Sequence, residues 1–171
     1  MPKLAALALV VGVLAVLDTW LFLTPLANMH LFVWMSFIAW GVHFMAGGKT
    51  QGVKASALSM SFGALVGMCA ALAIAQMAGL GQLAAPIAVG VGAALIVVAS
   101  KVPLLEAIPA GFYGFACIFA VMSATLAPTA AIVPTIVSIV IGSAFGYVSE
   151  LLTDMLTKKD IALEPGVGSP A

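Results

Sequence analysis

The chain has 171 residues, of which 64% are hydrophobic and only 7% are charged. A soluble globular protein averages roughly 45–50% and 25% for these two classes, so the composition argues against a water-soluble fold. The six basic residues are all lysines and the formal net charge is zero, which leaves no basic surface for nucleic acid.

The hydrophobic sequence is interrupted at five places where Gly, Pro, Asn or Lys should end a helix. A bilayer crossing needs roughly 20 apolar residues, so the chain holds about six crossings and no soluble domain. The first span follows a lysine, as in a signal peptide, but its apolar run is long enough for us to expect a retained span. We predict an all-α integral membrane domain, 1–157, and a short cytoplasmic tail, 158–171, with spans at 4–24, 29–47, 53–78, 82–100, 103–124 and 129–157.

All the lysines fall on one side of this six-span arrangement. They precede span 1, separate spans 2 and 3 and spans 4 and 5, and follow span 6, at Lys3, Lys49, Lys54, Lys101, Lys158 and Lys159. Lysine is enriched in the cytoplasmic loops of membrane proteins. We therefore expect both termini in the cytoplasm, an orientation that five or seven spans would not give.

Asp18 lies roughly 20 Å along the first span, in the outer half of the bilayer. An ionisable side chain at that depth needs a partner and is a candidate for function. The alternative is a carboxylate at the interfacial end of the helix. We retain Asp18 as a candidate for lining a solute route.

Aromatic residues gather in spans 2 and 5, and several of them lie too deep for an interfacial belt. They either pack against other helices or line a route for a solute. His43 lies near the end of the same span 2, where the polar end of an apolar helix explains it better than haem ligation. The lining candidates from these two spans are Trp34, Phe37, Trp40, His43, Phe44, Phe112, Tyr113 and Phe115.

The middle of span 5 carries a Pro-Ala-Gly sequence that predicts a loosened helix. Pro109 removes a backbone donor and Gly111 follows it, so this segment could supply polar backbone groups to a solute. Glu106 is expected in the first turn of the same helix, where a negative charge complements the helix dipole. Pro109, Gly111 and Glu106 complete the lining candidates.

Small residues recur at every fourth position in spans 3 and 6, which allows close approach of helix backbones. The predicted packing residues are Ser59, Gly63, Gly67, Ser138, Gly142 and Gly146. Spans 1–3 and 4–6 share this order of aromatic and small-residue helices, which suggests a 3+3 duplication with its halves inverted. The ladders also favour a homo-oligomer or a partner membrane subunit. Glu150 and Asp154 are expected at a solvated cytoplasmic end of span 6.

The sequence WMSFIAWGVHFMAGGKTQGVKASAL, followed after two spans by PLLEAIPAGFYGFACIFA, resembles the domain-of-unknown-function family 1097. The resemblance covers roughly residues 30 to 150 and depends on spaced aromatic residues and glycines. It implies a multi-pass protein of the bacterial inner membrane and carries over no catalytic residue.

The leading functional hypothesis is a channel or permease for a small, uncharged solute, since few charged groups lie inside the spans. The alternative is a non-transporting subunit of a larger membrane complex. No Ser/His/Asp set, metal-ligand cluster or phosphate loop is recognisable, so we expect neither an enzyme nor a bound cofactor or metal.

Overall fold

The structure, a computed structural model, describes residues 1–124 and 127–161, and every regular element within those ranges is helical. The prediction of an all-α fold is confirmed. The last ten residues of the predicted tail lie outside the described ranges, and its beginning continues the final helix. In chain order the elements are α1 (Lys3–Leu23), η1 (Ala27–Met29), α2 (Val33–Met45), α3 (Lys49–Val53), η2 (Lys54–Ser59), α4 (Met60–Gln76), η3 (Ala78–Leu83), α5 (Ala84–Ala99), α6 (Ile108–Ala124) and α7 (Pro128–Ile161).

Four helical segments in the described part of the chain are long and apolar enough to cross a membrane: Lys3–Leu23, Lys49–Gln76, Ala78–Ala99 and Pro128–Thr157. The third predicted span begins earlier than expected, because α3, the π-helical turn η2 and α4 follow one another without a break. Helices α2 and α6 are shorter, with 13 and 17 residues. At 1.5 Å per residue α2 measures about 20 Å, less than the roughly 30 Å of a hydrocarbon core.

The start of α6 corrects two expectations about the predicted fifth span. Residues 101–105 form turns and bends, residues 106 and 107 belong to no regular element, and the helix begins at Ile108. Pro109 therefore occupies the first turn, where its missing N–H needs no partner and its fixed φ suits a helix start. The helix is continuous through Gly114 instead of broken near mid-span, and Glu106 precedes it instead of lying in its first turn.

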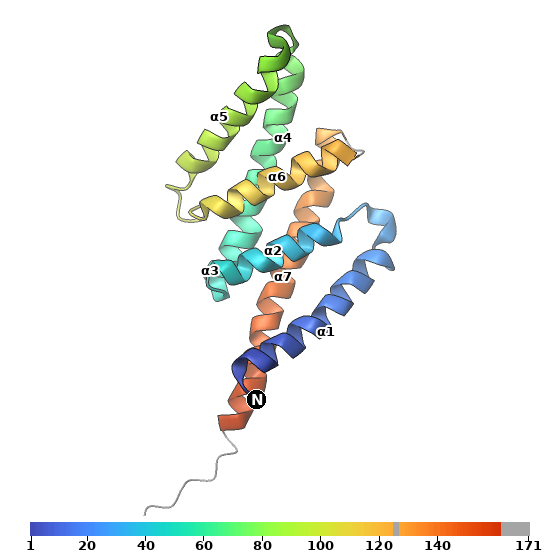
Figure 1. The fold of residues 1–171 in the computed structure, drawn as a ribbon, viewed down its shortest axis with the longest axis vertical. Helices are drawn as coiled ribbons and strands as arrows, with labels where there is room; N and C mark the ends of the chain where they lie inside the picture. The colour runs from blue at the N-terminus through green and yellow to red at the C-terminus, as the bar shows by residue number, and fades with distance from the viewer. Residues whose placement is uncertain (125–126, 162–171) are drawn as a thin grey trace, which may run out of the picture.

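Glycines bring two pairs of helices into backbone contact. A Cβ atom at Gly63 of α4 would overlap the carbonyl oxygen of Gly111 of α6, and one at Gly142 of α7 would overlap the carbonyl oxygen of Ser36 of α2. Small residues allow this kind of approach in membrane bundles. As a result α6 lies across α4 and α2 lies across α7, while α5 packs against α4 and α1 against α7 (Figure 1).

The ends of the helices lie along two opposite edges of the molecule. The start of α1, the α2–α3 turn, the α5–α6 loop and the end of α7 lie along the left and lower edge in Figure 1. The α1–α2 connection and η3 lie along the right and upper edge. Lysines occur in the first group of segments and are absent from the second.

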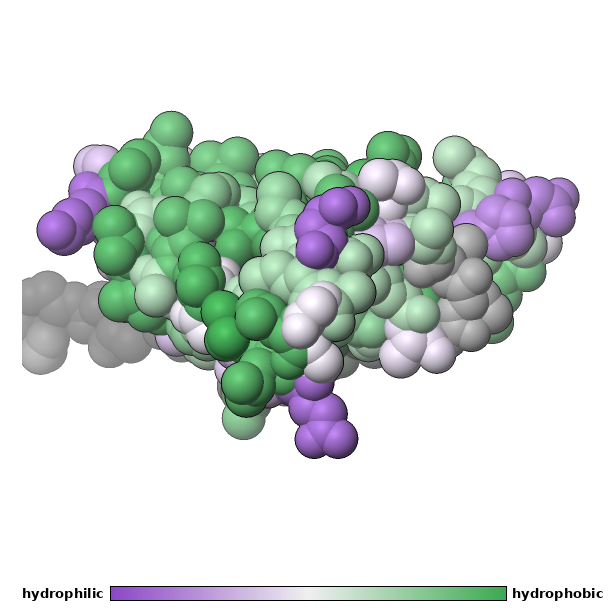
Figure 2. Space-filling view, turned by 90° about the horizontal axis from the view of Figure 1, so that it is seen from above, coloured by the Kyte–Doolittle hydropathy of each residue, from purple (hydrophilic) through white to green (hydrophobic). Residues whose placement is uncertain are grey.

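The outer surface of the bundle is apolar. Most of the face drawn in Figure 2 is hydrophobic, and hydrophilic residues occupy only a few patches on it. The outward side of α1 alone exposes Leu4, Leu9, Val13, Val16, Leu17 and Leu23. Such a large exposed apolar surface is unfavourable in water and suits a lipid environment. The structure therefore agrees with a multi-pass membrane protein.

Candidate functional site

Buried polar side chains are concentrated where α1, α2 and α7 meet. Among the described residues, none of the buried polar side chains lies on α5 or α6. Burying a polar group away from water is unfavourable unless it finds a hydrogen-bond partner, so this uneven distribution needs an explanation. We call the buried group along α1, α2 and α7, together with the half-buried Glu150, the polar seam, and define it as Asp18, Ser36, Trp40, His43, Ser143, Ser149 and Glu150.

Asp18 connects α1 to α2. Its side chain is fully buried, and the Ser36 hydroxyl donates a hydrogen bond of 3.0 Å to its Oδ1. The other carboxyl oxygen, Oδ2, is also buried and has no partner in the structure. Asp18 therefore has one satisfied and one unsatisfied oxygen, well inside a helix long enough to cross a membrane.

Glu150 on α7 holds the turn between α2 and α3. Gly47, Gly48 and Lys49 all have positive φ, and the Lys49 backbone N–H donates to Glu150 Oε2 at 2.6 Å. A Cβ at Gly48 would lie 2.6 Å from that same oxygen, so only glycine lets the carboxylate approach. Glu150 was expected only at a solvated helix end; its side chain keeps 23% of its surface exposed, and it also bonds to another part of the chain.

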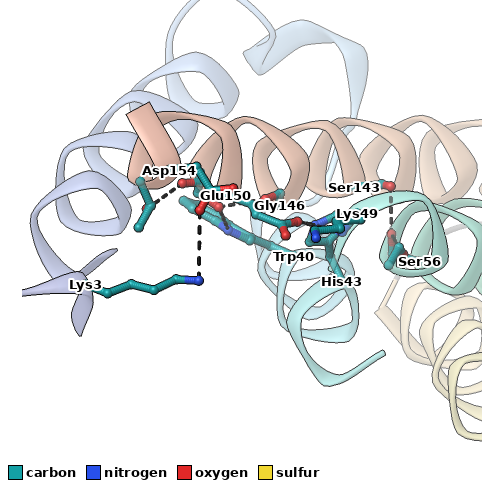
Figure 3. Close-up of polar contacts among 12 residues, drawn as sticks. Lys3, Trp40, His43, Lys49, Ser56, Ser143, Gly146, Glu150 and Asp154 are labelled. Atoms are coloured by element: carbon teal, nitrogen blue, oxygen red, sulfur yellow. Dashed lines mark hydrogen bonds and ion pairs between the residues drawn. The ribbon is translucent and has the colours of Figure 1, made fainter. Parts of the chain in front are cut away.

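His43 reaches the same carboxylate from α2. Its Nε2 lies 3.2 Å from Glu150 Oε2, and its ring is fully buried against Gly52 and Gly146 (Figure 3). The Nδ1 atom has no hydrogen-bond partner. Since Nε2 faces a carboxylate, it carries a proton and donates to Glu150 Oε2.

Two further hydrogen bonds extend the seam. Trp40 Nε1 donates to Ser149 Oγ at 3.0 Å, joining α2 to α7. Ser56 Oγ donates to Ser143 Oγ at 2.7 Å, joining η2 to α7 (Figure 3). Polar contacts therefore connect three segments to α7, namely α2, the α2–α3 turn and η2. None of the residues in the seam is a lysine.

A cleft of about 230 Å³ opens beside Glu150, between α1, α7 and the α2–α3 turn. Lys3 reaches into this region, with its Nζ 3.9 Å from Asp154 Oδ1. The cleft joins the seam to the lysine-bearing edge of the molecule and is large enough for a small polar solute. Its lining residues are Lys3, Leu7, Phe44, Gly47, Gly48, Glu150, Thr153 and Asp154.

The structure separates the aromatic candidates into two groups. Trp40 and Phe115 are buried, each in contact with neighbouring long helices. The other aromatic candidates expose between 37% and 44% of their surface and lie on the outer surface of the helix bundle: Trp34, Phe37, Phe44, Phe112 and Tyr113. Of these, only Phe44 borders the cleft.

The remaining lining candidates are divided in the same way. Gly111 is buried against α4, and Pro109 is exposed. Glu106 is exposed on the α5–α6 loop, where it accepts a hydrogen bond from the Gln51 side chain. Of the twelve lining candidates, the polar seam thus contains Asp18, Trp40 and His43.

The predicted packing residues lie at helix contacts or are buried. Gly63 and Gly67 meet α6, and Gly142 and Gly146 meet α2. Ser59 and Ser138 are buried, and Ser138 Oγ accepts a hydrogen bond from the Phe32 backbone N–H at 2.9 Å.

Sequence reasoning missed four members of the seam: Ser36, Ser143, Ser149 and Glu150. A signal was present for one of them, because Ser36, Trp40 and His43 are spaced by four and three residues and so share one face of a helix. No such spacing joins Asp18 to Ser36, whose contact depends on how α1 folds back onto α2.

Residues 8–154 match the model of a family described as a protein of unknown function, DUF1097. A search of curated proteins and a search of solved structures found no match. The family match agrees with the resemblance noted from the aromatic residues and glycines.

Proposed function

The chain belongs to the DUF1097 family, which has no known function, and from its architecture we propose that it transports a small, uncharged solute across a membrane. The observation that carries this proposal is the polar seam, a file of buried polar side chains inside an otherwise apolar bundle. Polar residues at membrane depth usually mark substrate or ion pathways.

We also infer an internal repeat from the packing of the helices, and related halves in opposite orientation are common among transporters. The packing partners exchange between the two halves: α1 and α2 pack on α7, while α5 and α6 pack on α4. The middle helix of each half thus lies on the last helix of the other half. Two copies of one three-helix unit related by a two-fold axis would pack in this way.

Equivalent residues make equivalent contacts in the two halves. Ser36 lies between Asp18 and Gly142, and Gly111 lies between Ile96 and Gly63. Farther along, Gly146 meets His43 as Gly67 meets Ile118. The buried residues of α1 and α5 recur at the same four-residue spacing, as Ala6, Val10, Leu14 and Asp18 in one and Ala84, Ala88, Gly92 and Ile96 in the other.

Three crossings per half would place the halves upside down relative to each other. We infer that the shorter helices α2 and α6 also cross the membrane core, which gives six spans and places every lysine at one surface. A bacterial inner membrane with both termini in the cytoplasm fits this pattern. Labelling single cysteines placed in the α5–α6 loop and in η3 from either side of sealed vesicles tests this orientation.

The two halves differ in polarity, which favours a route along the seam. Asp18, Ser36 and His43 in one half correspond to Ile96, Gly111 and Ile118 in the other. The equivalent positions of α5 and α6 therefore pack without polar side chains. We propose that the solute enters through the cleft beside Glu150 and moves along the seam, and that α4, α5 and α6 serve as scaffold.

An uptake assay in liposomes tests the proposal. Purified protein should speed the entry of at least one small neutral solute, such as urea, an amide, a polyol or ammonia, over protein-free liposomes. Ser36→Ala and Ser149→Ala should each reduce that rate several-fold, because both remove a hydroxyl from the seam. Ser100→Ala and Ser123→Ala are matched controls outside the seam and away from the protein core, and should leave it unchanged. Equal rates in all four variants would contradict the proposed route.

A second candidate function is that of a non-transporting subunit in a larger complex or homo-oligomer. The observation that favours it is the set of exposed aromatic side chains on α2 and α6, which could dock a partner. Purification in a mild detergent that always recovers one stoichiometric membrane partner, together with no solute uptake, would support this alternative.

A further inference from the structure

We propose that Asp18 and Ser36 form a proton-binding site inside the membrane, and that solute movement along the seam is coupled to the proton held there. The coupling depends on the proposed transport function, whereas the proton site itself does not.

The geometry leaves one oxygen of the carboxyl group free for a proton. The Ser36 hydroxyl donates to Oδ1, so that oxygen is satisfied in either protonation state. Oδ2 is buried without a partner. A proton on Oδ2 makes the group a neutral acid, and this O–H could donate to a solute or water that enters the seam.

No cationic group in the described part of the chain offsets a negative charge on Asp18. The chain has no arginine, and Lys3 lies at the opposite end of α1, about 22 Å away along the helix. On α2, His43 is roughly 10 Å along the helix from Ser36 and already faces Glu150. On α7 the charged residues before Lys158 are Glu150 and Asp154, both acidic, and His30 after η1 is exposed. An ionised carboxylate in such surroundings is strongly disfavoured.

A metal cation would be poorly held at this position. Hard cations in proteins take about six oxygen ligands. Within hydrogen-bond distance Asp18 meets one side chain, Ser36, and that hydroxyl has its hydrogen directed at the carboxylate. The described residues contain no group of three or more His, Cys, Asp or Glu side chains able to hold a metal ion. A proton is therefore the ligand that the chemistry of this site fits.

The inferred repeat provides a second argument, because a similar helix crossing exists without an acid. In the second half, Ile96 and Gly111 occupy the positions of Asp18 and Ser36 and pack against each other and Gly63. Packing alone therefore does not require a carboxyl group at this crossing. An apolar residue would avoid the unfavourable burial, so the acid serves a purpose other than holding the helices together.

Release of the proton from Asp18 conserves atoms and charge. The proton leaves Oδ2 for a water molecule or a basic atom of the solute, which becomes a cation, and Asp18 becomes a carboxylate that keeps the Ser36 hydrogen bond. Rebinding reverses each change. No oxidant or further reactant is needed.

Infrared spectroscopy of the purified protein tests the proton site without any transport. At neutral pH the wild type should show the carbonyl stretch of a protonated carboxylic acid, and Asp18→Asn should lose it. Ser36→Ala should shift that band, because Oδ1 loses its hydrogen bond. Asp154→Asn is the matched control, since Asp154 is more exposed than Asp18, and should keep the band. A wild-type spectrum identical to that of Asp18→Asn would overturn the proposal.

A flux measurement separates this inference from the proposed function. In liposomes, a proton gradient should change wild-type uptake several-fold and leave uptake by Asp18→Asn unaffected. Wild-type uptake that ignores the gradient would overturn the coupling, even if the protein transports. Absence of any uptake would contradict the proposed function, while the infrared band would still decide whether Asp18 binds a proton.

Discussion

Gly63 has no room for a single additional methyl group, because α6 crosses at its Cα position. A Cβ there would overlap the Gly111 backbone, which cannot move as a side chain can. We expect Gly63→Ala to lower the free energy of unfolding by about 1–3 kcal/mol or more. Gly12→Ala in α1, where no atom lies within 4 Å, should instead be neutral or stabilising by roughly 0.5–1 kcal/mol. Thermal unfolding in detergent measures both, and equal shifts would contradict the crossing geometry.

Glu150 and Asp154 are one helical turn apart on α7 but differ in their contacts. Glu150 accepts hydrogen bonds from the Lys49 backbone and His43, so Glu150→Ala should destabilise the protein by about 1–3 kcal/mol. Asp154 makes a longer, solvent-exposed ion pair with Lys3, and Asp154→Ala should change stability by less than about 1 kcal/mol. Chemical unfolding in mixed micelles would measure the difference, and the reverse order would argue against the anchoring role of Glu150.

The contact between helices α2 and α7 organises the polar seam. Its Trp40–Ser149 hydrogen bond can be isolated with a double-mutant cycle of Trp40→Phe and Ser149→Ala. We expect a coupling free energy of about 0.5–1.5 kcal/mol, the net contribution of one such bond. As a control, Phe112→Leu on the exposed side of α6 should be additive with Ser149→Ala. Additivity in both pairs would show that the bond contributes nothing.

Sequence patterns predicted elements better than contacts between elements. Apolar runs and their Gly and Pro interruptions gave the helices and most connections, because these features depend on residues near one another in the chain. The start of α6 was misplaced at residue 103, so Pro109 was interpreted as a break near mid-span instead of a first-turn residue. Asp18 and His43 were singled out, but Ser36 and Glu150 gain their meaning only from helices that meet in space.

At the scale of the whole molecule, each half needs the other half to complete its packing. The α2 helix lies on α7 and the α6 helix lies on α4, so a half made alone would lack the partner of its middle helix. We expect the chain divided between Gly79 and Leu80, in the exposed turn between α4 and α5, to assemble when both pieces are produced together. A tag on either piece should recover the other one.

Each piece produced alone should aggregate or be degraded, because its buried polar and glycine faces would be uncovered. Size-exclusion chromatography in detergent distinguishes these outcomes. A single half that remains monodisperse without the other would contradict the exchange of helices between the halves.

The crossing of α2 over α7 also determines when the protein can be completed during synthesis. Trp40 and Ser149 are 109 residues apart, and His43 and Glu150 are 107 apart. At roughly 5–20 residues per second, a ribosome needs about 5–20 seconds to pass from one partner to the other. During that interval α2 has been synthesised and α7 has not. Asp18, Ser36 and His43 therefore lack the α7 side of their final packing. The nascent first half is therefore the stage at which this protein depends most on the insertion machinery to shield it.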